Sequence, residues 1–500
     1  MFGKESVFPL LAFGIPLLLR AIPEVLMGPY VVGFDTMGHY VPTTLLWLKG
    51  GVDLWRYIAT APLFYTVAVS SVAAGVPIIT ALKIIPPVLH GLLGLSVYGF
   101  AKKGLSWSPK KSAFTAVLAT AYFVALRVSW DMLRNELALV FFFVVLTLLG
   151  TGIGSRYSWR RLLLLFLAMI AVVLTHQLVT IIMFGMVLFT VVQKAFRKKL
   201  VEAAGLFAVA LPPALLFFAI LYFSPVVSEF RVIFGFPLSS DGWLQLFGFP
   251  SYAAMLASEA GFFLYCFLPI LPFVVFGFWR FRNFQMRTWV LLILIASLVP
   301  MVSPSNLRWI MLLTYPFAFF VAEALSRLKD VSWRRFRLTA CKASVAYLVS
   351  STAFLSLGFM VSPPENPLFY FNSGQLNGYI YQIPSSMLQN TVSIADCGDT
   401  ANALRWFESN VTEDGVLLAH RAFYGWALSS LSQDQVVLYE YNSPENTAKQ
   451  LSKEGQSQIH LIWWVSGLGW YGQPTVADSF AEIYRSGRIA IYAYAPASVA

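Results

Sequence analysis

Two ionisable residues, Asp35 and His39, follow the first long apolar run of the chain, within residues 33–40. They are four positions apart, so a helix would place both side chains on one face. A carboxylate there can act as a general base toward a hydroxyl group, and an imidazole can orient it or contact a phosphate. A simpler alternative is that Asp35 caps a short helix that begins at Thr36. The residue pattern alone leaves both interpretations open.

Arg134 lies on one helical stripe with Arg127 and Asp131, at the expected outer end of an apolar segment. We expect Arg127 and Asp131 to form an ion pair that anchors this end, because i,i+4 pairs of opposite charge are common in helices. Arg134 remains open to another partner. Its planar guanidinium suits the oxygen atoms of a phosphate.

Four further residues are candidates for binding a substrate. Arg308 opens a late apolar run, where it either reaches the headgroup layer or holds the phosphate of a lipid carrier. His176 interrupts another apolar run, either as a buried hydrogen-bonding residue or as part of a site. Arg56 and Arg231 fall in two long loops that we expect on the outer side.

The composition of the chain indicates that these residues belong to a membrane protein. The chain has 500 residues, of which 58% are hydrophobic and 12% are charged, and its mean hydropathy is +0.69. Soluble domains have about 25% charged residues. The net charge of +11 comes mainly from short basic clusters between apolar runs, which is the positive-inside pattern. The excess of basic residues therefore indicates how the chain is oriented in the membrane, and we expect no nucleic-acid partner.

The sequence predicts an α-helical polytopic protein of the plasma membrane, with about eleven transmembrane helices, a cytoplasmic N-terminus and an extracytoplasmic C-terminal domain. Residues 61–80 are apolar, but a full crossing there would put Lys102 and Lys103 outside, so we expect an interfacial or re-entrant helix. The expected spans lie near residues 7–29, 84–101, 112–130, 136–153, 162–175, 177–193, 201–223, 261–279, 288–302, 309–325 and 340–361.

Two domains are expected. Residues 1–361 form the transmembrane domain, with outer loops at 30–83 and 224–260. In residues 362–500 acidic side chains outnumber basic ones, and helical and strand patterns alternate, which predicts a small soluble α/β domain. Its expected elements are a helix at 400–409 and strands at 416–419, 458–464 and 488–494.

Four features, in this order, resemble the GT-C superfamily of polytopic glycosyltransferases, which use lipid-phosphate-linked sugars. They are the acidic motif at 33–40, the Pro-led apolar segment at 62–65, the span that opens with residues 308–317, and tail motifs at 403–416 and 484–492. The chain is similar to the protein O-mannosyltransferase and aminoarabinose transferase group. The resemblance implies that Asp35 activates the acceptor and that Arg308 contacts the carrier phosphate.

The resulting hypothesis is an inverting hexosyl- or pentosyltransferase. It would move a sugar from a polyprenyl- or dolichyl-phosphate donor to a glycan, lipid or protein acceptor on the extracytoplasmic face, among membrane lipids. Asp35 would be the catalytic base. One carboxylate and one imidazole neither make nor exclude a Mg²⁺ or Mn²⁺ site, so no cofactor is firmly predicted. The predicted substrate-binding residues are His39, Arg56, Arg134, His176, Arg231 and Arg308.

Two other classes of protein remain as alternatives. A secondary transporter or flippase would carry unpaired charges at mid-membrane, and Arg20 and Glu24 are the residues to inspect. A catalytically silent scaffold would leave Asp35, Arg134 and Arg308 far apart in the fold.

Overall fold

A computed structural model describes most of the chain. The described residues are 6–50, 57–58, 62–150, 159–223, 250–298, 306–328, 340–372, 383–439, 443–465 and 476–495. Most of the predicted outer loop at 224–260 lies outside them.

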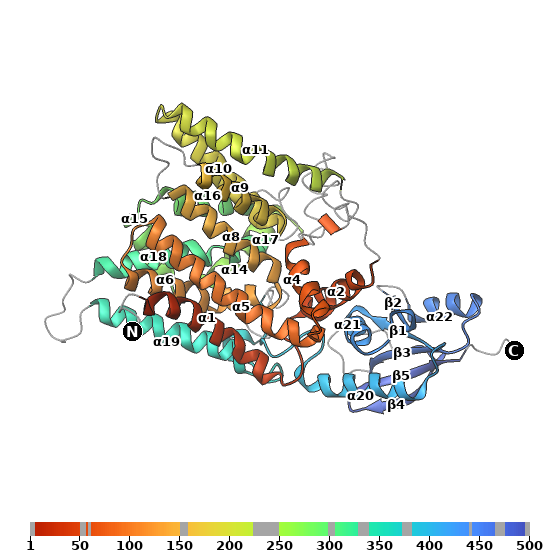
Figure 1. Cartoon of the computed structure of the whole chain (residues 1–500). Coiled ribbons are helices and arrows are strands. Elements are labelled where there is room, and N and C mark those ends of the chain that lie inside the picture. Colours follow the sequence, from red (N-terminus) through yellow and green to blue (C-terminus); the bar gives the residue numbers. More distant parts are fainter. Residues whose placement is uncertain are drawn as a thin grey trace.

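The described residues up to Val361 form a bundle of helices that lie side by side (Figure 1). Helix α1 packs along α5, and α5 also packs against α8 and α6. In chain order the elements are α1 (Val7–Leu26), η1 (Thr36–Tyr40), α2 (Val41–Leu48), α4 (Pro62–Ala73), α5 (Ile78–Gly99), η2 (Phe100–Gly104), α6 (Pro109–Ala121), α7 (Phe123–Asp131), α8 (Leu133–Gly150), α9 (Trp159–Val173), α10 (Gln177–Phe196), α11 (Leu200–Phe223), α14 (Tyr252–Phe267), α15 (Leu271–Arg280), α16 (Phe284–Leu298), α17 (Asn306–Met311), α18 (Thr314–Arg327) and α19 (Ala340–Val361).

A helix lies at every one of the predicted spans. By length and composition, 7 helices within the described ranges are able to cross a membrane, and up to 9 if each of two bent pairs forms one span. The bent pairs are α6 with α7, at 61°, and α14 with α15, at 93°. Helices α9 and α16, of 15 residues each, fill the two remaining predicted ranges. The polytopic helical class is therefore confirmed.

Helix α4 falls in the segment for which we predicted an interfacial or re-entrant helix. It has 12 residues and ends at Ala73, which is shorter than the roughly 20 residues that a single crossing requires. A turn at Gly75 then leads into α5, which begins at Ile78. The length of α4 agrees with an interfacial helix.

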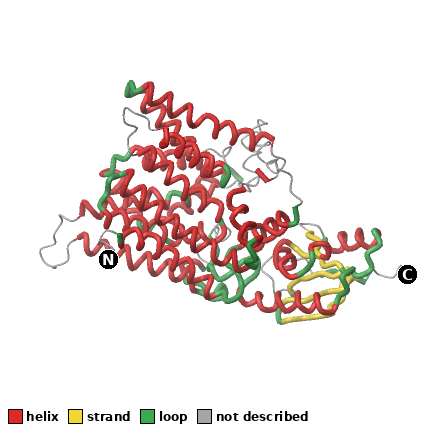
Figure 2. The backbone as a smooth tube through the Cα atoms, in the orientation of Figure 1, coloured by secondary structure: helices red, strands yellow, loops and turns green. Residues whose placement is uncertain are grey.

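The chain after α19 contains the five strands of the described residues, which form one sheet in the order β2-β1-β3-β5-β4. Strands β2, β1 and β3 are parallel, and β5 and β4 continue the sheet in antiparallel fashion. The small C-terminal α/β domain is thus confirmed (Figure 2). Its elements are α20 (Ile394–Asn410), β1 (Val416–His420), α21 (Arg421–Ser430), β2 (Val436–Tyr439), α22 (Pro444–Lys453), β3 (Ile459–Trp464), β4 (Phe480–Ser486) and β5 (Ile489–Tyr494).

Helix α21 is the element of the C-terminal domain that packs against the transmembrane part. It packs on η1 and on α2, so the sheet lies at the end of the bundle that carries the first loop (Figure 1). A Cβ atom added at Gly425 would lie only 1.8 Å from the backbone oxygen of Met37. The two backbones therefore meet without a side chain between them.

Candidate functional site

Asp35 stands at the entry to η1, a single π-helical turn of five residues. Such turns are frequent at functional sites. The Asp35 side chain makes no capping hydrogen bond, so the interpretation of Asp35 as a helix cap is wrong. Its Oδ1 lies 3.8 Å from Nε2 of His39, as the four-residue spacing predicted, and 26% of its side chain is exposed. The carboxylate is therefore accessible and has an imidazole beside it.

The approach to Asp35 depends on Gly33. This residue has a φ of +106°, which favours glycine, and a Cβ atom here would lie 2.2 Å from the carbonyl oxygen of Trp130. The Gly33 N–H donates to the carbonyl of Gln389 at 3.1 Å. The loop thus packs directly on α7 two residues before the carboxylate.

Arg134 lies within electrostatic range of Asp35. Its guanidinium contacts the Tyr40 hydroxyl and lies 6.0 Å from the centre of the Tyr65 ring. The Tyr40 hydroxyl donates to the Asp131 carbonyl at 3.0 Å, and burial raises the pKa of Tyr40, which keeps this hydroxyl protonated. Two buried tyrosines therefore orient the guanidinium beside the carboxylate.

Arg127 and Asp131 form the predicted i,i+4 ion pair, and both side chains are buried. The Arg127 guanidinium also lies 5.1 Å from the ring centre of Trp130. Arg127 and Asp131 thus neutralise each other at the end of α7. Arg134, the remaining arginine on this helical stripe, faces the site.

Arg308 and His176 complete the cluster. Asp131 lies within electrostatic range of both Asp35 and Arg308, and His176 within range of both Arg134 and Arg308. His176 caps α10, because its Nδ1 accepts the Leu178 N–H at 3.2 Å. Among the described residues, Asp35 is thus related to Arg308 only through Asp131, and Arg134 is related to Arg308 only through His176.

A cavity of about 180 Å³ is lined by residues of α2 and α4 and of the segment between them, namely Trp47, Gly50, Tyr57, Thr66, Val69 and Ser70. The Trp47 ring lies 4.9 Å from the Tyr65 ring that Arg134 approaches. Aromatic rings and hydroxyl groups thus line a cavity that is linked to Arg134 through the Tyr65 ring.

Arg421 is a site residue that sequence reasoning missed. It is the first residue of α21, and its guanidinium contacts the imidazole of His39: Nη2 contacts Nε2 and lies 3.0 Å from Nδ1. The sequence analysis counted Arg421 only among the charges of the C-terminal domain. No local pattern could reveal the contact, because it depends on the docking of α21 against η1.

Arg56 and Arg231 lie outside the described residues, so their roles stay predictions. Within the described ranges, no three His, Cys, Asp or Glu side chains gather where they could hold a metal ion. The site as described consists of one open carboxylate, two histidines and three arginines.

No protein-family model and no curated protein matches the sequence. Solved structures do match. ArnT from Cupriavidus metallidurans bound to undecaprenyl phosphate has 13% identity and a TM-score of 0.52, over 98% of this chain and 97% of that chain. The apo structure of the same protein has 15% identity and a TM-score of 0.53, and the match covers 98% of this chain and 97% of that chain.

The archaeal oligosaccharyltransferase AglB from Archaeoglobus fulgidus, in complex with an inhibitory peptide and a dolichol-phosphate, has 12% identity and a TM-score of 0.52. That match covers 89% of this chain and 68% of AglB. Such low identities establish the fold and leave the activity open. This chain is a multi-pass membrane protein with the same fold as ArnT and AglB.

Proposed function

We propose that this protein is a glycosyltransferase that takes a sugar from a polyprenyl- or dolichyl-phosphate donor. The observation that carries the proposal is the accessible Asp35 carboxylate beside His39, in a loop that packs on the Trp130 carbonyl four residues before Arg134. The undecaprenyl phosphate and dolichol-phosphate present in the ArnT and AglB structures support a lipid phosphate as the carrier. The acceptor is a glycan, lipid or protein with a nucleophilic hydroxyl.

Asp35 takes the proton of the acceptor hydroxyl while its oxygen attacks the anomeric carbon of the sugar. The bond between that carbon and the phosphate oxygen breaks, and the phosphate leaves with the electron pair. Attack from the face opposite the leaving group inverts the anomeric centre. General base catalysis of this kind contributes about 10²- to 10⁴-fold to a rate.

Arg134 and Arg308 hold the departing lipid phosphate, whose negative charge increases as the bond breaks. Fixed cations of this kind stabilise a transition state without reorganising. Tyr40 and Tyr65 keep the Arg134 guanidinium in place. His39 and His176 border the site, and Arg56 and Arg231 remain predicted ligands of the substrate. The site would face the extracytoplasmic side, with the N-terminus in the cytoplasm.

The test is transfer of radiolabelled sugar from a panel of polyprenyl-phosphate hexoses and pentoses to a membrane extract. Asp35→Asn should lower the rate by about 10²- to 10⁴-fold. Asp414→Asn, an exposed carboxylate of the C-terminal domain, is the matched control and should retain activity. Undecaprenyl phosphate should still bind Asp35→Asn and should bind Arg134→Met and Arg308→Met weakly. Full transfer by Asp35→Asn would refute the assignment.

A further inference from the structure

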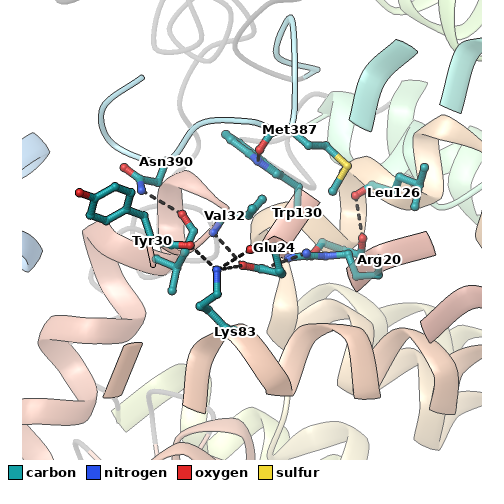
Figure 3. Close-up of polar contacts among 11 residues, drawn as sticks. Arg20, Glu24, Tyr30, Val32, Lys83, Leu126, Trp130, Met387 and Asn390 are labelled. Atoms are coloured by element: carbon teal, nitrogen blue, oxygen red, sulfur yellow. Dashed lines mark hydrogen bonds and ion pairs between the residues drawn. The ribbon is translucent and has the colours of Figure 1, made fainter. Parts of the chain in front are cut away.

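Residues 30–33 lead directly to Asp35, and partners on two sides hold their backbone (Figure 3). The Tyr30 carbonyl accepts from Lys83 Nζ at 2.6 Å, and the Val32 N–H donates to Glu24 Oε2 at 3.3 Å. The other side belongs to the segment before α20. There the Asn390 amide donates to the Val31 carbonyl at 2.9 Å, and the Gly33 N–H donates to Gln389.

Arg20, Glu24 and Lys83 form one buried cluster on the first of these sides (Figure 3). Arg20 Nη1 lies 2.9 Å from Glu24 Oε1, and Lys83 Nζ lies 3.7 Å from Glu24 Oε2. Arg20 also donates to the Ser129 carbonyl on α7 at 3.0 Å. The charges that would have suggested a transporter are thus paired with one another.

The cluster holds two cations and one carboxylate, so it carries one positive charge in excess. Charges enclosed in an apolar helix bundle are costly and usually serve a purpose. Lys83 also donates to the Glu24 carbonyl at 2.5 Å, in the last turn of α1, where helical carbonyls lack partners and attract cations. The bond to the Glu24 carbonyl alone would be enough to cap the C-terminal end of α1. The second bond, to the Tyr30 carbonyl, fixes the loop.

We propose that the Arg20–Glu24–Lys83 cluster positions Asp35 for catalysis. The cluster fixes residues 30–32, and Gly33 then rests on the carbonyl of Trp130, four residues before Arg134. The catalytic carboxylate and the phosphate-binding arginine are therefore placed against the same part of the chain. The inference rests on the proposed function and assigns Lys83 and Glu24 as positioning residues.

The chain offers a matched control at α6 and α18. Lys111 contacts Glu323, which also pairs with Arg327 at i,i+4, just as Lys83 contacts Glu24, which pairs with Arg20. Both lysine side chains are 21% exposed. Lys83→Met and Lys111→Met each leave a neutral arginine–glutamate pair. Only Lys83→Met releases the Tyr30 carbonyl.

Amide exchange of residues 28–35 and transfer kinetics of the full chain in lipid nanodiscs test the inference. Lys83→Met should speed exchange in this segment about tenfold or more. It should lower kcat about 10- to 100-fold, with KM for the lipid-phosphate sugar within about twofold of wild type because Arg134 and Arg308 remain. Lys83→Arg should partly restore the slow amide exchange and kcat. Lys111→Met should change neither the exchange of residues 28–35 nor kcat.

The inference would be overturned if Lys83→Met left the exchange unchanged, or if it sped the exchange without lowering kcat. An equal loss of kcat in Lys111→Met would also overturn it. If Lys83→Met does not fold, Glu24→Gln takes its place, because it removes the carboxylate that pairs with Lys83 while keeping the size of the side chain, and it should speed the same exchange. Exchange is measured without substrate. Full activity of Asp35→Asn would therefore refute the proposed function, while the exchange data would still show whether the cluster holds the loop.

Discussion

The Arg421 guanidinium, at the start of α21 in the C-terminal domain, contacts the imidazole of His39 in the first loop, 382 residues earlier in the chain. A guanidinium only donates hydrogen bonds, so the ring nitrogen that accepts from it carries no proton. The Arg421 cation therefore disfavours a positive charge on His39, whose Nε2 lies 3.8 Å from Asp35 Oδ1. The C-terminal domain thereby supplies a residue of the candidate site.

Replacing Arg421 should reduce sugar transfer. Arg421→Ala removes a cation that disfavours a positive charge on His39, and a charged His39 would pair with Asp35 and compete for the carboxylate that acts as base. We expect a loss of about tenfold in kcat, greatest at acidic pH, measured as a pH–rate profile. Arg485→Ala, which breaks an exposed pair with Glu482 in the same domain, should behave as wild type. An identical profile for Arg421→Ala would contradict this role.

Glu136 should be replaceable by glutamine but not by leucine. His90 Nε2 donates to the Thr120 carbonyl at 3.0 Å, and His90 Nδ1 lies 2.5 Å from Glu136 Oε1, with both side chains fully buried. One proton must lie between Nδ1 and the carboxyl group. Glu136→Gln supplies an N–H to Nδ1, whereas Glu136→Leu leaves that nitrogen without a partner, at a cost of about 1–3 kcal/mol. Thermal unfolding in detergent should separate the two variants, and equal melting temperatures would disprove the shared proton.

His460 should make the C-terminal domain less stable in acid. Burial lowers the pKa of this histidine below its usual value of 6.5. The unfolded chain therefore binds more protons than the folded one between the two pKa values, and the free energy of unfolding falls as the pH drops through this window. Thermal unfolding of the full chain from pH 7.5 to 5, followed by the exchange of β3, measures this fall. His460→Gln should flatten the dependence, and an unchanged slope would exclude His460 as its source.

The sequence predicted well the features that depend on neighbouring residues. The apolar spans, strands β1, β3 and β5, the Asp35–His39 proximity and the Arg127–Asp131 pair all follow from local spacing. Strands β2 and β4 and helices α21 and α22 were missed. Strand β2 has four residues, and most of the seven residues of β4 are exposed, so neither strand shows a strong apolar pattern.

Contacts between distant segments could not be predicted in the same way. Lys83 and Glu24 are 59 residues apart, and His90 and Glu136 are 46 apart. Each appeared in the sequence as an isolated charge in an apolar run, and only the packing of α5 against α1 and α8 pairs them. Arg421 is the extreme case, because its partner lies in the other domain.

The close contact between Gly425 and the backbone of Met37 has a consequence for biosynthesis. The first loop leaves the ribosome early, but the helix that packs on it is made almost four hundred residues later. During that interval the nascent chain holds Asp35 in a loop that still lacks one of its walls. The candidate site can be completed only after α21 has been translated and delivered to the same side of the membrane.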